Sequence, residues 1–177
     1  MAKAKKGGKQ GKAWVIWAGI AAVAVVVIVV AAALAGGGSR EAVQPPSSTK
    51  PAVVNQDLVI PISEISGTAG FYPAEVDGTR LEVIAVKAAD GTIRTAFNTC
   101  QVCYSSGRGY YKQEGSVLVC QNCGNRFSME QVELSSGGCN PVPIFSENKT
   151  VTAESIIISK EYLAKAKAIF ANWKTGG

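Results

Sequence analysis

The chain has 177 residues, five cysteines, no histidine and a formal net charge of +5. This charge is uneven, because residues 1–40 carry six basic side chains and no acidic one, whereas the rest carries 12 basic and 13 acidic side chains. A domain without excess positive charge has no electrostatic footprint for nucleic acid, so we expect no nucleic-acid partner. The absence of histidine excludes imidazole metal ligands, c-type haem attachment and Ser-His or Cys-His catalytic pairs.

The N-terminus predicts a membrane anchor. A basic head, residues 1–12, precedes residues 13–38, which contain no charged side chain. As a helix, the apolar run from Trp14 to Ala35 would span about 33 Å, enough for a hydrocarbon core of about 30 Å. Trp14 and Trp17 lie at the basic end, where interfacial aromatic residues are expected. The sequence therefore predicts a single pass through lipid, with a cytoplasmic N-terminus and an extracytoplasmic C-terminal domain.

A cleaved signal peptide is the alternative, because Ala33-Leu34-Ala35 resembles a cleavage site. Apolar regions of signal peptides usually have about 7–15 residues, and this longer run favours an uncleaved signal-anchor. Residues 36–54 are rich in Gly, Pro and Ser, and we expect residues 39–56 to form a flexible stalk. In either case we expect residues 57–177 to form a domain outside the cytoplasm.

The pattern of this domain predicts a mainly β fold of α+β type, a small meander or sandwich-like structure. After a short strand at 57–62, Asp77-Gly78 and Asp90-Gly91 separate three runs rich in β-branched and aromatic residues. Asp-Gly between such runs is a strong hairpin signal, so we expect a three-stranded meander that ends at Cys100. Glu114-Gly115 predicts a second hairpin, which ends at Cys120.

The C-terminal part predicts a last strand at 155–159 and an amphipathic helix. Ser159 is placed to cap a helix that runs to Trp173. Apolar side chains recur along it at helical spacing, so we expect this face to pack on the sheet.

The five cysteines all lie between residues 100 and 139. Two CxxC pairs at this separation are typical of four-cysteine metal sites. If the two hairpins pair, their turns bring four thiolates around one metal, namely those of Cys100, Cys103, Cys120 and Cys123. Cys139 lies in a Gly-Gly-Cys-Asn-Pro turn, and we expect it to act as a ligand or a redox thiol rather than as simple packing. Arg126 and Phe127 are expected to shield the site.

Three chemistries remain open for these cysteines. Four thiolates suit structural zinc, and they equally suit iron or an iron–sulfur cluster. Disulfides are the third, because an exported domain meets oxidising conditions, although an odd count leaves one thiol unpaired.

The cysteines and their neighbours resemble the C-terminal domain of FtrD-like membrane iron–sulfur proteins. The resemblance extends over roughly residues 57–170 and is carried by Phe97-Asn98-Thr99-Cys100-Gln-Val-Cys103-Tyr104, Gly109-Tyr110, Val119-Cys120-Gln-Asn-Cys123-Gly124, Arg126-Phe127 and Gly137-Gly138-Cys139-Asn140-Pro141. It implies a membrane-attached redox protein linked to iron uptake, with an iron permease or a redox protein as its partner. It also implies iron or an iron–sulfur cluster as the cofactor, with Cys100, Cys103, Cys120, Cys123 and Cys139 as the metal-site residues.

Many relatives place this domain after several membrane spans, whereas this sequence predicts one, which favours a free-standing anchored electron carrier. The alternatives are a zinc-ribbon-like binding module and a protein that delivers a soft metal such as Cu(I). The acidic residues are scattered over expected turns and strands and form no catalytic constellation. We therefore expect a carrier rather than an enzyme.

Overall fold

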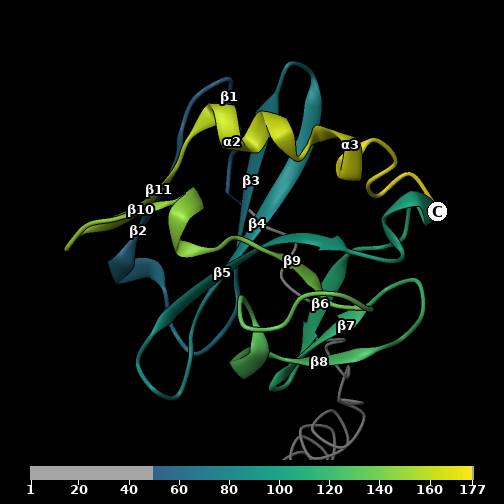
Figure 1. The fold of residues 1–177 in the computed structure, drawn as a ribbon, viewed down its shortest axis with the longest axis horizontal. Helices are drawn as coiled ribbons and strands as arrows, with labels where there is room; N and C mark the ends of the chain where they lie inside the picture. Colours follow the sequence, from purple (N-terminus) through teal and green to yellow (C-terminus); the bar gives the residue numbers. More distant parts are fainter. Residues whose placement is uncertain (1–49, 177) are drawn as a thin grey trace, which may run out of the picture. The chain divides into compact units, whose positions relative to one another are not determined.

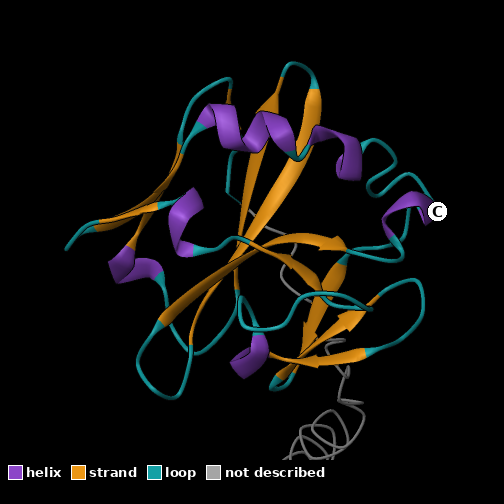
Figure 2. Ribbon diagram, in the orientation of Figure 1, coloured by secondary structure: helices purple, strands orange, loops and turns teal. Residues whose placement is uncertain are grey.

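The computed structural model describes residues 50–176, which form a mainly β domain with three small sheets and two short α-helices (Figures 1 and 2). The mainly β prediction is confirmed, with three small sheets in place of a simple meander or sandwich. The strands are β1 Val53–Val54, β2 Leu58–Pro61, β3 Gly70–Val76, β4 Thr79–Lys87, β5 Ile93–Cys100, β6 Tyr111–Glu114, β7 Val117–Cys120, β8 Arg126–Ser128, β9 Pro141–Pro143, β10 Thr150–Val151 and β11 Ser155–Ile158; the α-helices are α2 Lys160–Lys165 and α3 Lys167–Phe170; the 3₁₀ turns are η1 Ile62–Glu64, η2 Tyr104–Ser106, η3 Met129–Gln131 and η4 Ser146–Asn148.

The largest sheet has the strand order β1-β3-β4-β5-β9 and contains the predicted meander. β3, β4 and β5 pair antiparallel in sequence order. Asp77 and Gly78 both have positive φ, 48° and 75°, which is the backbone signature of a type I′ hairpin turn. The meander ends at Cys100 as predicted, so the strongest turn signals in the sequence place the first cysteine.

β4 is the central strand, and its two faces enter two different hydrophobic cores. Leu81, Val83 and Ala85 lie in one core, which also contains residues of α2, α3 and β11; we call it the helix-side core. Ile84 and Val86 lie in the other, which contains Cys100, Cys103 and Cys120; we call it the cysteine-side core. Side chains alternate across a strand, so a strand that is apolar on both faces must be covered on both. One layer of sheet therefore separates the helices from the cysteines.

The second hairpin is also confirmed. β6 and β7 pair antiparallel, the turn between them is formed by Gly115 and Ser116 directly after Glu114, and β7 ends at Cys120. The structure adds β8, which the sequence did not predict and which pairs with β7. Together β6, β7 and β8 form a small sheet that carries the second half of the cysteine site (Figure 1).

The C-terminal helix is present but divided. The Ser159 side chain accepts a hydrogen bond from the N–H of Tyr162, as expected of an N-cap. The predicted single helix to Trp173 is wrong, because α2 and α3 meet at Ala166 in a tighter turn. There the N–H of Ala166 bonds to the carbonyl of Leu163, and the N–H of Ile169 bonds to that of Ala166, as in a 3₁₀ turn. The apolar face packs on the sheet as predicted, with Phe170 buried in the helix-side core.

The N-terminal predictions lie mostly outside the described residues. These are the head 1–12, the anchor 13–38 and most of the stalk 39–56. Within residues 50–176, no helix is long and apolar enough to cross a membrane. The described end of the predicted stalk belongs to the fold, since β1 pairs in parallel with β3 ahead of the expected boundary at Asp57.

Candidate metal centre

The five cysteines are brought together from three segments of the chain. Cys100 is the last residue of β5, and Cys103 lies in the turn that follows. Cys120 is the last residue of β7, and Cys123 lies in the next turn. Cys139 lies in the loop before β9, and β9 pairs with β5 at Cys100 and Pro141. The sheet register therefore delivers Cys139 to the first CxxC turn.

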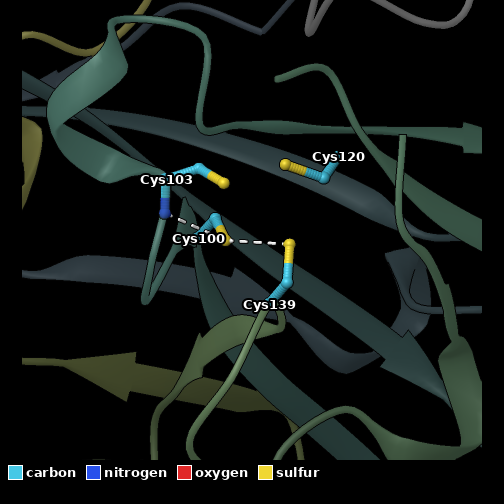
Figure 3. A group of neighbouring side chains, drawn as sticks. All are labelled: Cys100, Cys103, Cys120 and Cys139. Carbon is cyan, nitrogen blue, oxygen red and sulfur yellow. Dashed lines mark hydrogen bonds between the residues drawn. The ribbon is translucent and has the colours of Figure 1, made fainter. Parts of the chain in front are cut away.

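Four of the sulfurs form one compact group. The Sγ atoms of Cys100, Cys103, Cys120 and Cys139 all lie within 4.8 Å of one another. Figure 3 shows these four side chains pointing toward a common centre from different strands and loops. Cys100, Cys103 and Cys120 are buried, with 0%, 9% and 1% of their surface exposed, and Cys139 is partly buried. Within residues 50–176, this is the group whose donor atoms could hold a metal ion, and every donor is sulfur.

The spacing of the four sulfurs suits a single ion. A tetrahedral site with metal–sulfur bonds of about 2.3 Å places its sulfurs about 3.8 Å apart. Cys100 and Cys139 have their Sγ atoms at 3.3 Å, and the whole group stays within 4.8 Å. Small side-chain movements would therefore complete a tetrahedron around one ion, whereas a cluster of several irons would have to push the sulfurs apart.

Cys123 lies at the edge of this group. Its side chain is exposed, and its Sγ lies 2.8 Å from the Sγ of Cys139. The two CxxC turns predicted Cys123 as the fourth member of the compact group, but the structure gives that place to Cys139. All five cysteines are free thiols, so the disulfide alternative finds no support in the structure.

Glycine shapes both CxxC turns. A side chain at Gly109 would place its Cβ 2.3 Å from the carbonyl oxygen of Cys103, so only glycine fits against the first turn. The carbonyl of Gly109 also accepts the N–H of Cys100 at 2.6 Å. Gly124 has φ of 73° and donates its N–H to the carbonyl of Cys120, which closes the second turn.

Side-chain amides join the three cysteine loops. The Nδ2 of Asn125 donates to the carbonyl of Cys139 at 2.7 Å, which connects the Cys123 turn to the Cys139 loop. The N–H of Gln101 donates to the carbonyl of Asn140, and the Oε1 of Gln101 accepts from the N–H of Gly137. Asn140 is buried, and its Oδ1 has no hydrogen-bond partner among the described residues.

Tyr111 packs against the cysteine sulfurs from within the cysteine-side core. It is buried in the cysteine-side core, and its hydroxyl lies 3.9 Å from the Sγ of Cys139. Its backbone is held by the side chain of Asn98, which is also bonded to the buried carboxylate of Glu82 at 2.7 Å. No local sequence pattern predicts this group of polar side chains. One feature of the sequence could have indicated them: Glu82 is the only polar residue in the apolar run 81–86 of β4.

Burial and crowding give the thiols very different acidities. Burial alone would raise the pKa of Cys100, but the Tyr111 hydroxyl and the backbone N–H groups of the first turn lower it below its ordinary value. Burial raises the pKa of Cys120 to about 12. Burial and the thiols of Cys123 and Cys100 raise the pKa of Cys139.

The exposed thiol differs from the buried ones. The Cys139 thiol and the backbone N–H of Asn125 lower the pKa of Cys123 to about 7. Without a cation, then, the buried sulfurs cannot all carry negative charge at once. A bound metal ion would supply the opposing charge that lets these thiols deprotonate together.

The predicted shield is half correct. Phe127 is buried in the cysteine-side core with Cys100 and Cys120. The prediction for Arg126 is wrong, because its side chain is exposed and pairs with Glu114 across the sheet of β6, β7 and β8. Adjacent residues of a strand point to opposite faces, so only one of these two can face the cysteines.

Comparison with known families gives one match. The family described as "Membrane iron-sulfur containing protein FtrD-like" matches residues 65–170, which include all five cysteines. No curated protein and no solved structure matches the chain.

Proposed function

Because the chain belongs to the FtrD-like family of membrane iron–sulfur proteins, we propose that it is a membrane-anchored electron carrier with an iron centre. The observation that carries this proposal is the compact group formed by Cys100, Cys103, Cys120 and Cys139. A thiolate-bound iron centre exchanges one electron and, with four protein ligands, needs no open position for a substrate. The protein is therefore proposed as a carrier rather than a catalyst.

The residues around the sulfurs suit electron transfer. Phe127 and the buried strands keep water from the inner sulfurs, which limits the reorganisation of solvent when the charge changes. The hydroxyl of Tyr111 lies near the sulfurs of Cys139 and Cys100, and a hydrogen bond to sulfur is one of the features that sets a reduction potential. Cys139 lies next to the exposed Cys123, so the inner sulfurs have a short route to a docked partner.

The proposed location follows from the family and the predicted anchor. We propose that residues 13–38 hold the protein in the cell membrane with the cysteine domain on the extracytoplasmic side. An iron permease or a second redox protein in the same membrane is the proposed partner, so that electron transfer accompanies iron uptake. The description of the family as membrane proteins supports the attachment to a membrane.

A structural zinc site is the second candidate. The four thiols come from the end of β5, the end of β7 and the loop before β9. One ion bound to them would join three segments, as structural zinc does in small domains with limited cores. The connection of three segments favours a structural zinc ion, while the four sulfur donors suit zinc and iron equally well.

Metal analysis with a visible absorption spectrum separates the two candidates. We would purify the full chain without oxygen and measure iron, zinc and acid-labile sulfide per chain. The expected result is about one iron, little sulfide, and sulfur-to-iron absorption that bleaches on reduction. One zinc per chain without visible absorption would refute the electron carrier and support the structural site. Four cysteine-to-serine variants, one for each of the compact group, should each lose most of the metal.

A further inference from the structure

We propose that Cys123 is an exchange thiol, through which a metal ion enters and leaves the buried group of Cys100, Cys103, Cys120 and Cys139. This inference rests on the four-thiolate metal site of the proposed function, but not on electron transfer or on iron. It assigns Cys123 a role in transfer of the ion rather than in its final coordination.

Solvent has access to the sulfur of Cys123 but not to the inner sulfurs. Cys100 and Cys120 are 0% and 1% exposed, so an incoming ion or chelator cannot reach them directly. Cys103 is also buried, and Cys139 is only partly exposed. Cys123 is the exposed cysteine of the five. An ion arriving from solvent therefore meets this thiol before any other.

Cys139 lies between Cys123 and the inner sulfurs. Its Sγ lies 2.8 Å from that of Cys123 and 3.3 Å from that of Cys100. The sulfur of Cys139 is therefore close both to the exposed sulfur of Cys123 and to the buried sulfur of Cys100. An ion held by Cys123 and Cys139 can pass inward by exchanging Cys123 for Cys100 while Cys139 stays bound.

The exchange balances without any change of oxidation state. Cys123 loses a proton when its sulfur binds the ion, and it regains a proton when it is replaced. Cys100 loses a proton as its sulfur takes over, because metal ligands bind as thiolates. No electron is transferred, and release of the ion follows the same steps in reverse.

The loops that carry Cys123 and Cys139 are joined by a hydrogen bond, which keeps these two thiols together. The Asn125 side chain holds the carbonyl of Cys139 at 2.7 Å, two residues from Cys123. Gly124, Gly137 and Gly138 all have positive φ, and a Cβ on any of them would contact nothing within 4 Å. Open space around these glycines leaves room for a thiolate-bearing donor or acceptor of the ion to approach.

The charged side chain nearest to Cys123 in sequence is that of Arg126, which is paired with Glu114. Residues 101–107, 121–125 and 134–140 contain no acidic or basic side chain. Val102 and Leu134 are 62% and 68% exposed on two of these loops. A donor would therefore be recognised by sulfur chemistry rather than by electrostatic attraction, which fits transfer of a soft or borderline ion from thiolate to thiolate.

The test uses zinc and cobalt, so that it does not depend on iron. The full chain and Cys123→Ser would be loaded anaerobically with one zinc ion, and release would be followed with an excess of a coloured zinc chelator. We expect Cys123→Ser to keep one zinc per chain but to load and release it at least tenfold more slowly. Val102→Ser, which changes an exposed side chain in the other CxxC turn, is the matched control and should exchange like the unchanged chain.

Cobalt gives a second measurement that a general structural effect would not mimic. The intensity of sulfur-to-cobalt absorption counts bound thiolates, so it should be unchanged in Cys123→Ser and lower in Cys139→Ser.

Two results would overturn the inference. If Cys123→Ser lost the zinc ion or part of the absorption, Cys123 would be a permanent ligand of the bound ion. An unchanged exchange rate would overturn it too. Isolation of the protein with zinc instead of iron would refute the electron carrier alone.

Discussion

The side chain of Asn98 holds the backbone of Tyr111 by both of its hydrogen-bonding groups: the Oδ1 accepts the N–H at 2.7 Å and the Nδ2 donates to the carbonyl at 3.2 Å. The same Nδ2 donates to the carboxylate of Glu82 at 2.7 Å. Asn98 precedes Cys100 by two residues in β5, and Tyr111 begins β6. One buried amide therefore joins the meander to the hairpin that carries Cys120.

Asn98→Ala should destabilise the protein by about 2–4 kcal/mol. The change removes two hydrogen bonds to Tyr111 and leaves Glu82, which is 4% exposed, without its amide partner. Urea unfolding of the purified protein measures the loss of stability. The exposed Gln131→Ala serves as the control and should change the unfolding free energy by less than about 0.5 kcal/mol. Similar losses for the two variants would show that the buried amide has no special role.

Tyr111→Phe should lower the reduction potential of the iron centre. A hydroxyl that donates to a sulfur stabilises the reduced and more negative state, and a hydrogen bond of about 1 kcal/mol corresponds to about 40 mV for one electron. Redox titration followed by visible absorption measures the shift. Tyr104→Phe is the matched control, because Tyr104 is 39% exposed and should leave the potential unchanged. An unchanged potential in Tyr111→Phe would show that the Tyr111 hydroxyl does not influence the reduction potential.

Alkylation of the metal-free chain should begin at Cys123. The thiolate is the reactive form, and the Cys139 thiol and the backbone N–H of Asn125 lower the pKa of Cys123 to about 7. Its rate of reaction with iodoacetamide should therefore rise as pH increases through 7 and level off above it. Burial raises the pKa of Cys120 to about 12, so this thiol should stay unreacted near neutral pH.

Peptide mapping by mass spectrometry would identify the modified cysteine at each pH. Cys123→Ser should abolish the labelling near pH 7. Labelling that is spread evenly over the five cysteines would contradict the order of acidities.

The fold was predictable where the sequence carries local signals. Asp77-Gly78 and Asp90-Gly91 mark the two turns of the meander, and Glu114-Gly115 marks the turn of the hairpin between β6 and β7; these turns place Cys100 and Cys120 at strand ends. The capping of the last helix by Ser159 follows from the same kind of local chemistry. Its division at Ala166 does not, since no Pro or Gly marks the position where the hydrogen bonds change to the 3₁₀ pattern.

The sequence predicted that the cysteines come together, but it did not predict how they are arranged. Spacing indicates which turn carries a cysteine, yet it gives no register between distant strands. β9 pairs with β5 beside Cys100, and this pairing brings Cys139 into the compact group and leaves Cys123 outside it. Asn98 and Tyr111 were missed for a related reason, because their contact depends on how two hairpins meet.

The loop that leads to Cys139 depends on a buried ion pair, which gives a final prediction. The carboxylate of Glu133 accepts the N–H of Thr95 at 2.8 Å and pairs with Lys149, whose side chain is 4% exposed. The Nζ of Lys149 also donates to the Oγ1 of Thr95 at 2.9 Å. Glu133 has φ of 68°, so this residue keeps a left-handed backbone at the point where the chain turns toward Cys139.

Lys149→Met should therefore cost about 3 kcal/mol of unfolding free energy, because it leaves the carboxylate of Glu133 buried without a cation. Adding Glu133→Gln should restore part of the loss, and urea unfolding of the single and double variants measures this coupling. Arg126→Met is the control: its pair with Glu114 is more than half exposed on both sides, and such pairs contribute less than about 1 kcal/mol. If Lys149→Met costs no more than Arg126→Met, the buried pair does not hold the Cys139 loop.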